Sequence, residues 1–215
     1  MKFITRNHRL FFFPIWFLIN LIQAGTTELF DDEAYYWIYS QYPARGYFDH
    51  PPMIAWLIKA GYTIFPYELG VRLFIVLMNT ATLFIIQKLT EKKNDFLFYA
   101  IAASIAVAQI GGIIAVPDIP LLFFVSLFFL LYRHFLSNTS IVNSFLLGIS
   151  IALMLYSKYH GILILFFTLI SNPKLLSKYQ TSLAALVALL LFFPHLYWQY
   201  EQHFPSVQFH LFERN

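Results

Sequence analysis

The sequence predicts an all-α polytopic membrane protein with about seven transmembrane helices, and two observations carry this prediction. Of its 215 residues, 59% are hydrophobic and only 12% are charged, whereas soluble domains carry charge at roughly 25% of positions. The apolar residues also fall into long runs, and a helix needs about 20 mostly apolar residues to cross a bilayer. We therefore expect a single transmembrane domain covering residues 1–215.

Seven apolar runs are candidate spans, namely residues 10–25, 71–89, 96–116, 119–136, 142–157, 159–171 and 181–198. The first run follows three basic residues, a pattern that also describes a signal peptide cleaved near Ala24 and Gly25. Because several spans follow, we favour an uncleaved first helix. The fifth and sixth runs are short for spans, so an alternative is one kinked hairpin around Lys158.

The stretch between the first two spans, residues 26–70, is predicted to be an outer loop with juxtamembrane helices. Its residues 51–65 are largely apolar and contain Trp56 and Tyr62. They lie between two proline breaks and are too few to span, which favours a helix lying in the membrane interface.

Basic and acidic residues sort to opposite faces of this seven-span arrangement. With the N-terminus in the cytoplasm, nine of the 14 Lys and Arg residues lie inside, as the positive-inside rule expects; these are Lys2, Arg6, Arg9, Lys88, Lys92, Lys93, Arg133, Lys174 and Lys178. Nine of the 11 acidic residues lie outside: Glu28, Asp31, Asp32, Glu33, Asp49, Glu68, Asp118, Glu201 and Glu213. Acidic residues contribute little to orientation, so their gathering indicates function on the outer face. The net charge of +3 reflects topology and does not indicate nucleic-acid binding.

Two acidic motifs in the outer loop are candidate sites. Asp31, Asp32 and Glu33 precede a run of aromatic residues. They are either acids in the first turn of a helix, where the macrodipole stabilises anions, or a carboxylate held at the membrane edge as a general base. Asp49 and His50 precede two prolines and could bind a metal, bind a phosphate or begin the following helix.

Three later features add to this set. Asp118 lies between two prolines, as a functional acid at the membrane edge or as a helix cap. Lys158 suits an anionic phosphate, although snorkelling to the headgroups would also explain it. His210 and Arg214 are four residues apart and would share a helix face. All five features fall on the outer face, whereas independent capping residues would scatter between both sides, so we interpret them as one outward-facing site.

Together these motifs resemble the GT-C superfamily of membrane glycosyltransferases, which includes protein O-mannosyltransferases and lipid A aminoarabinose transferases. The first-loop pattern is the most specific part: Asp32 and Glu33, then Tyr35-Tyr36-Trp37, then Tyr47-Phe48-Asp49-His50-Pro51-Pro52 with Trp56. Looser matches follow at Pro117-Asp118, Ser157-Lys158, Pro194 with Trp198, Phe209-His210-Leu211 and Arg214. The similarity covers the N-terminal half of the family pattern, so we expect a chain that is truncated relative to the family.

The resemblance implies an inverting hexosyl or pentosyl transfer from a polyprenyl-phosphate carrier to a hydroxyl of a lipid, glycan or protein. It also implies a bacterial inner membrane with the site on the periplasmic face. Carried over by position, Asp32 is the general base with Glu33 beside it, while Asp118 is a further site residue. His50, Lys158 and Arg214 would bind the donor phosphate, His50 standing where aminoarabinose transferases have Lys. Asp49 and His210 match positions associated with a divalent metal ion.

Two other functions stay open at this point. A lipid-linked donor needs no nucleotide pocket, and the sequence has no glycine-rich phosphate loop, which agrees with the transferase. A transporter or flippase for a lipid-linked anion would place ionisable residues near the bilayer midplane, and the middles of the predicted spans are nearly free of charge. An inactive, truncated membrane scaffold is the third possibility.

Overall fold

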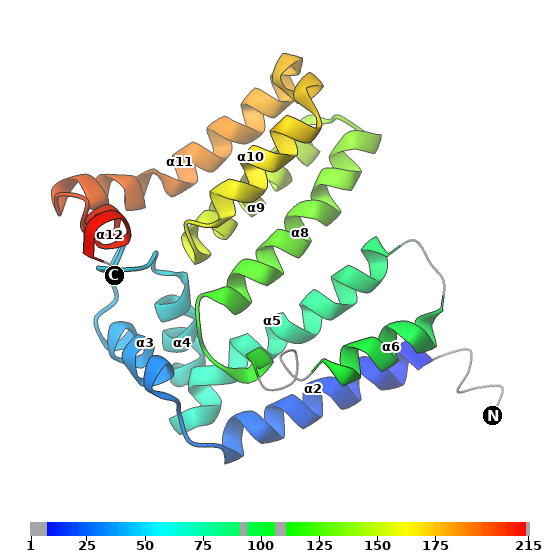
Figure 1. The fold of residues 1–215 in the computed structure, drawn as a ribbon, viewed down its shortest axis with the longest axis vertical. Helices are drawn as coiled ribbons and strands as arrows, with labels where there is room; N and C mark the ends of the chain where they lie inside the picture. Colours follow the sequence, from blue (N-terminus) through cyan, green and yellow to red (C-terminus); the bar gives the residue numbers. More distant parts are fainter. Residues whose placement is uncertain (1–7, 91–93, 106–110, 214–215) are drawn as a thin grey trace. The chain divides into compact units, whose positions relative to one another are not determined.

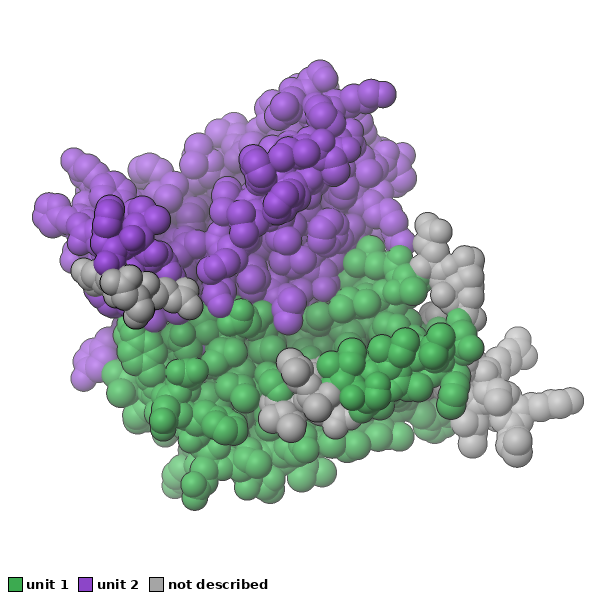
Figure 2. Space-filling view, viewed as in Figure 1, with its two compact units in different colours: residues 1–41, 55–119 green, residues 42–54, 120–215 purple. Residues whose placement is uncertain are grey.

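The computed structural model describes residues 8–90, 94–105 and 111–213, and every regular element within these ranges is helical (Figure 1). The predicted all-α class is therefore confirmed. The chain forms two compact units (Figure 2): unit 1 comprises Met1–Gln41 and Ala55–Ile119, and unit 2 comprises Tyr42–Ile54 and Pro120–Asn215. One domain covering residues 1–215 stays a prediction.

Unit 1 is built around a pair of packed helices, α2 and α5. Its elements are α2 (His8–Thr26), α3 (Asp31–Gln41), α4 (Met53–Ile64), α5 (Tyr67–Leu89), α6 (Asp95–Ser104) and a 3-10 turn, η1 (Gly111–Ile113). Buried Ala24, Val76 and Ile113 come from α2, α5 and η1 and form one apolar cluster. The short helices α3 and α4 match the predicted juxtamembrane helices in sequence position.

The prediction of one continuous helix over residues 96–116 is wrong. Helix α6 ends at Ser104, Ile105 is extended, and a separate 3-10 turn begins at Gly111. Consecutive glycines have low helix propensity, and Gly112 lies directly against α5. A Cβ atom on Gly112 would be 2.1 Å from the Asn79 side-chain nitrogen. The turn Gly111–Ile113 therefore packs closely against α5.

Unit 2 is a bundle in which α9 packs along α11. Its elements are α8 (Asp118–Ser137, whose first two residues belong to unit 1), α9 (Ile141–Ser157), α10 (Gly161–Ser171), η2 (Pro173–Ser177), α11 (Tyr179–Glu201), α12 (Pro205–Gln208) and a π-helical turn, η3 (Phe209–Glu213). A Cβ on Gly148 would lie 2.6 Å from the Ala184 carbonyl oxygen, so glycine allows the two backbones to approach. Helices α9 and α10 are separated by a break at residues 158–160, and the choice between two spans and one kinked hairpin around Lys158 stays a prediction.

Among the residues that the structure describes, three helices, α5, α8 and α11, are long and apolar enough to cross a membrane. The other apolar helices are shorter, so the count of seven spans stays a prediction, as does the face on which each loop lies. Helix α10 leaves Phe166 and Phe167 55% and 62% exposed, and Leu190 on α11 is 64% exposed. Large apolar side chains gathered on a surface in this way suit contact with lipid, as expected for a membrane protein.

Candidate functional site

The acidic motif begins a helix, and its neighbouring carboxylates point to different environments. Asp31, Asp32 and Glu33 form the first turn of α3, where unpaired backbone N–H groups and the helix dipole favour negative charge. Asp32 is exposed, whereas Glu33 is completely buried. Successive residues on a helix face directions about 100° apart, so one carboxylate of this pair faces outward while the other enters the interior of unit 1.

Glu33 is fully engaged inside unit 1. Its Oε1 accepts hydrogen bonds from Arg72 Nε at 2.7 Å and from the Ala115 N–H at 2.8 Å. Its Oε2 accepts from the Phe30 N–H at 3.0 Å and pairs with a terminal nitrogen of Arg72. Both oxygens of Glu33 are therefore occupied, and these contacts fix the start of α3, which carries Asp32.

Arg72 ties the start of α5 to the end of α2. Its guanidinium is completely buried and donates to the carbonyl oxygens of Ala24 at 3.2 Å, Thr27 at 2.8 Å and Glu28 at 2.8 Å. It also donates to the Thr27 hydroxyl at 2.7 Å. Sequence reasoning missed this role, because it counted Arg72 only as a basic residue at an outer helix end. The available signal was an Arg inside the apolar run of a span, where an ionisable side chain needs a partner.

Asp118 lies in the same unit as Asp32 and Glu33. It is exposed in the first turn of α8, as predicted for an acid at this helix start. Ala115, whose N–H binds Glu33, is three residues earlier in the chain. The Glu33–Arg72 pair thus fixes the beginning of α3 and also the segment leading to Asp118.

The second acidic motif lies in unit 2, in the loop before α4. Asp49 is only 8% exposed, and its Oδ2 is 2.7 Å from His50 Nδ1. Both side chains are largely buried, since that of Asp49 is 11% exposed and that of His50 is 14% exposed. The predicted Asp–His pair is therefore present as a direct contact.

Three side chains from the C-terminal part of unit 2 hold the main chain of this loop. His195 Nδ1 contacts the Arg45 carbonyl oxygen at 2.7 Å, and Ser206 donates to that of Tyr47 at 3.0 Å. His210 Nε2 contacts the carbonyl oxygen of Asp49 at 2.9 Å. The three carbonyls belong to alternate residues, Arg45, Tyr47 and Asp49, so the loop is held at three points along its length. His210 is therefore beside Asp49, as predicted, but through the backbone.

The predicted metal ligands do not form a coordination set. Within the described ranges, no group of three or more His, Asp or Glu side chains is placed to hold a metal ion. A carbonyl oxygen only accepts, so His210 Nε2 carries the proton directed at Asp49, and Nδ1 of that ring keeps the lone pair. His50 Nδ1 faces the Asp49 carboxylate.

Of the two predicted phosphate-binding cations Lys158 and Arg214, the structure describes only Lys158. Lys158 caps the C-terminal end of α9 in unit 2 and is half-buried. Arg214 lies outside the described residues. The predicted site residues thus divide between the units, with Asp32, Glu33 and Asp118 in unit 1 and Asp49, His50, Lys158 and His210 in unit 2.

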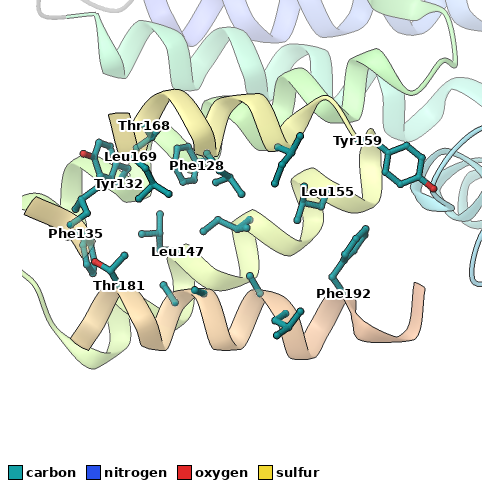
Figure 3. A pocket seen from close by; sticks show the side chains of 18 of the residues that line it. Phe128, Tyr132, Phe135, Leu147, Leu155, Tyr159, Thr168, Leu169, Thr181 and Phe192 are labelled. Atoms are coloured by element: carbon teal, nitrogen blue, oxygen red, sulfur yellow. The ribbon is translucent and has the colours of Figure 1, made fainter. Parts of the chain in front are cut away.

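Unit 2 also contains an apolar cavity of about 550 Å³ among α8, α9, α10 and α11 (Figure 3). Its walls carry Phe128, Leu147, Leu155 and Phe192, among other apolar side chains. Tyr159 stands at one end with its hydroxyl directed away from the cavity (Figure 3). The cavity is therefore lined by apolar side chains and ends at Tyr159, which follows Lys158 in the sequence.

Two comparisons with known proteins both point to glycosyltransferases. A family model described as dolichyl-phosphate-mannose-protein mannosyltransferase matches residues 49–198. The match includes Asp49, His50, Asp118 and Lys158. The chain is also similar to lipid A galacturonosyltransferase RgtD of Rhizobium johnstonii, with 23% identity over 206 residues. These residues make up 91% of this chain and 43% of that protein, so the chain spans less than half of the relative's length. No solved structure matches the chain.

Proposed function

The chain belongs to the dolichyl-phosphate-mannose-protein mannosyltransferase family of GT-C glycosyltransferases, and on this premise we propose that it transfers a sugar from a polyprenyl-phosphate carrier to an acceptor hydroxyl. The observation that carries the proposal is the exposed Asp32 carboxylate at the head of α3, held there by the buried Glu33–Arg72 pair. The transfer takes place on the non-cytoplasmic face of a bacterial inner membrane.

In the proposed reaction, Asp32 takes the proton of the acceptor hydroxyl as the oxygen attacks the anomeric carbon of the sugar. A new glycosidic C–O bond forms, and the bond between the anomeric carbon and the phosphate oxygen breaks. Attack opposite the leaving group inverts the anomeric configuration. The electron pair leaves with polyprenyl phosphate, so the step needs a base and a positive environment for the departing phosphate.

We assign the phosphate environment to unit 2. Lys158, His50 and Arg214 supply cationic or N–H groups, and the Asp49 carboxylate orients the His50 ring from 2.7 Å away. Asp118 is proposed as an additional acid near the acceptor. These roles follow the family resemblance residue by residue, and the acceptor is a lipid, a glycan or a protein.

The carrier hydrocarbon is proposed to occupy the apolar cavity of unit 2, which ends at Tyr159, the residue after Lys158. Lipid tails are as apolar as the cavity walls, so burial alone gives little driving force for entry from the bilayer. Selection among lipids must therefore come from packing against the walls and from the phosphate at the polar end. This arrangement distinguishes a charged carrier lipid from ordinary acyl chains.

Transport of a lipid-linked anion is less well supported. A transporter would be expected to hold ionisable groups near the bilayer midplane. The buried Glu33–Arg72 pair instead lies at helix starts, in the first turn of α3 and near the beginning of α5. A sugar-transfer assay distinguishes a transferase from an inactive scaffold.

The assay supplies membranes containing the chain with the same sugar on polyprenyl phosphate or on a nucleotide. We expect glycosylated acceptor only from the lipid-linked donor, because the sequence has no glycine-rich loop to hold the phosphates of a nucleotide. The measurement is labelled sugar recovered on acceptor, against membranes lacking the chain. Equal transfer from a nucleotide sugar, or none from either donor, would contradict the proposal.

The proposed face is tested by single-cysteine labelling, which is clean because the chain contains no Cys. Tyr42 and Leu176 are similarly exposed, at 76% and 69%, and lie on opposite predicted faces. We expect an impermeant maleimide to label Tyr42→Cys in intact cells and Leu176→Cys only after permeabilisation. The reverse pattern would place the loop carrying Asp32 in the cytoplasm.

A further inference from the structure

A second set of polar side chains extends the contacts that hold the Asp49–His50 loop. The Tyr159 hydroxyl lies 2.9 Å from His195 Nε2, and Gln199 Nε2 donates to it at 2.8 Å. Gln199 Nε2 also donates to the Ser206 hydroxyl at 2.7 Å. His195, Gln199 and Ser206 are at most 4% exposed, so these bonds are shielded from water. The set links α11, α12 and the turn between α9 and α10.

The proton positions in this network follow from its two ends. The Arg45 carbonyl only accepts, so His195 Nδ1 carries a proton and Nε2 accepts from Tyr159. The oxygen of Tyr159 then accepts from Gln199. Ser206 likewise accepts from Gln199 and donates to the Tyr47 carbonyl. Each hydrogen bond has a defined donor and acceptor. The bonds run without a gap from the Arg45 carbonyl to the Tyr47 carbonyl, so removing one donor interrupts the connection between these two points of the loop.

Tyr159 connects this network to the apolar cavity. Its ring lines the cavity, and its hydroxyl points toward the polar cluster (Figure 3). A tyrosine hydroxyl is protonated near neutral pH, so Tyr159 has a proton to donate to His195. One side chain thus contacts both the proposed hydrocarbon site and the support of the loop.

We propose that Tyr159, His195 and Gln199 are positioning residues that hold the Asp49–His50 loop for the phosphate of a polyprenyl-phosphate carrier, and that Tyr159 links loop geometry to the chain in the cavity. The proposal rests on the proposed function, since it assumes that carrier. None of the three residues takes part in bond making. Their effect is to fix where His50 stands when the phosphate arrives.

The test uses Tyr159→Phe, which keeps the ring and removes the hydroxyl, and Gln199→Glu, which keeps the shape and removes both donated bonds. Tyr200→Phe is the matched control. Tyr200 lies next to Gln199 on α11 and is 67% exposed, and its hydroxyl forms no hydrogen bond with the described residues. Each variant is made in the full chain with a nitroxide on Arg45→Cys, whose side chain is exposed. The label reports loop mobility without any requirement for sugar transfer.

We expect faster nitroxide motion in Tyr159→Phe and Gln199→Glu, and wild-type motion in Tyr200→Phe. Binding of polyprenyl phosphate should weaken about tenfold in both network variants, the effect of losing roughly one hydrogen bond to a charged group. Binding of the uncharged polyprenol should stay within about twofold, because the cavity wall is retained.

Two results would overturn the inference: unchanged loop mobility in both network variants, or equal weakening for polyprenyl phosphate and polyprenol. The second would mean that the hydroxyl supports the cavity and not the loop. If the wild-type chain bound neither lipid, the proposed function would fail, and the nitroxide comparison would still decide whether the network holds the loop.

Discussion

Replacing Asp32 with Asn is expected to lower sugar transfer about a hundredfold to ten-thousandfold, the range typical of a positioned general base. Asn has the same shape and can still accept a hydrogen bond at the start of α3, so the helix should form. Its amide cannot take the proton of the acceptor hydroxyl. The measurement is the initial rate of transfer from a polyprenyl-phosphate donor, in membranes with matched protein levels.

Asp31→Asn is the matched control for this change. Asp31 is exposed in the same first turn of α3, so the variant removes the same charge from the same helix dipole. A loss of about 0.3–1 kcal/mol in helix stabilisation would be shared by both variants. We expect Asp31→Asn to retain transfer within about threefold. Similar losses in the two variants would show that charge, and not proton transfer by Asp32, is what matters.

Removing Arg72 is expected to destabilise unit 1 strongly. Arg72→Met leaves Glu33 buried without its partner, a change that costs about 3–5 kcal/mol. It also removes the donors that bind the end of α2. The measurement is thermal unfolding in detergent, with limited proteolysis between α2 and α3 as a local readout.

The double variant Glu33→Leu with Arg72→Met separates the ion pair from the other contacts. Removing both charges abolishes the uncompensated carboxylate, so stability should recover in part. Recovery stays incomplete because the carbonyl oxygens of Thr27 and Glu28 lose their donor. Lys59→Met, at a partly exposed position of α4, is the control and should change stability by about 0.5 kcal/mol or less. Equal stability of Arg72→Met and the control would contradict the positioning role.

Much of the fold could be predicted from local sequence. Apolar runs located the long helices, and the acidic run before the aromatic residues located the start of α3. Local patterns failed over residues 96–116, because hydropathy does not report that Gly112 packs against Asn79. The glycines and the following proline were visible, but their effect depends on a neighbour far away in the chain.

The candidate site was predicted less completely, for a similar reason. Asp32 and Glu33 are adjacent acids, and only the distant partner Arg72 decides which one is buried. His195 fell inside the predicted span 181–198 and Gln199 just after it, although two polar residues four apart share a helix face. That spacing at the end of an apolar run was the signal for the network that holds the loop.

The most direct test of the central proposal is carrier release by the 215-residue chain alone in proteoliposomes. Free polyprenyl phosphate and glycosylated acceptor are quantified together by mass spectrometry, for the wild type, Asp31→Asn and Asp32→Asn. We expect equal amounts of the two products from the wild type and Asp31→Asn, and neither above background from Asp32→Asn. Carrier release without glycosylated acceptor, or undiminished transfer by Asp32→Asn, would contradict the assignment of this chain as a transferase with Asp32 as its base.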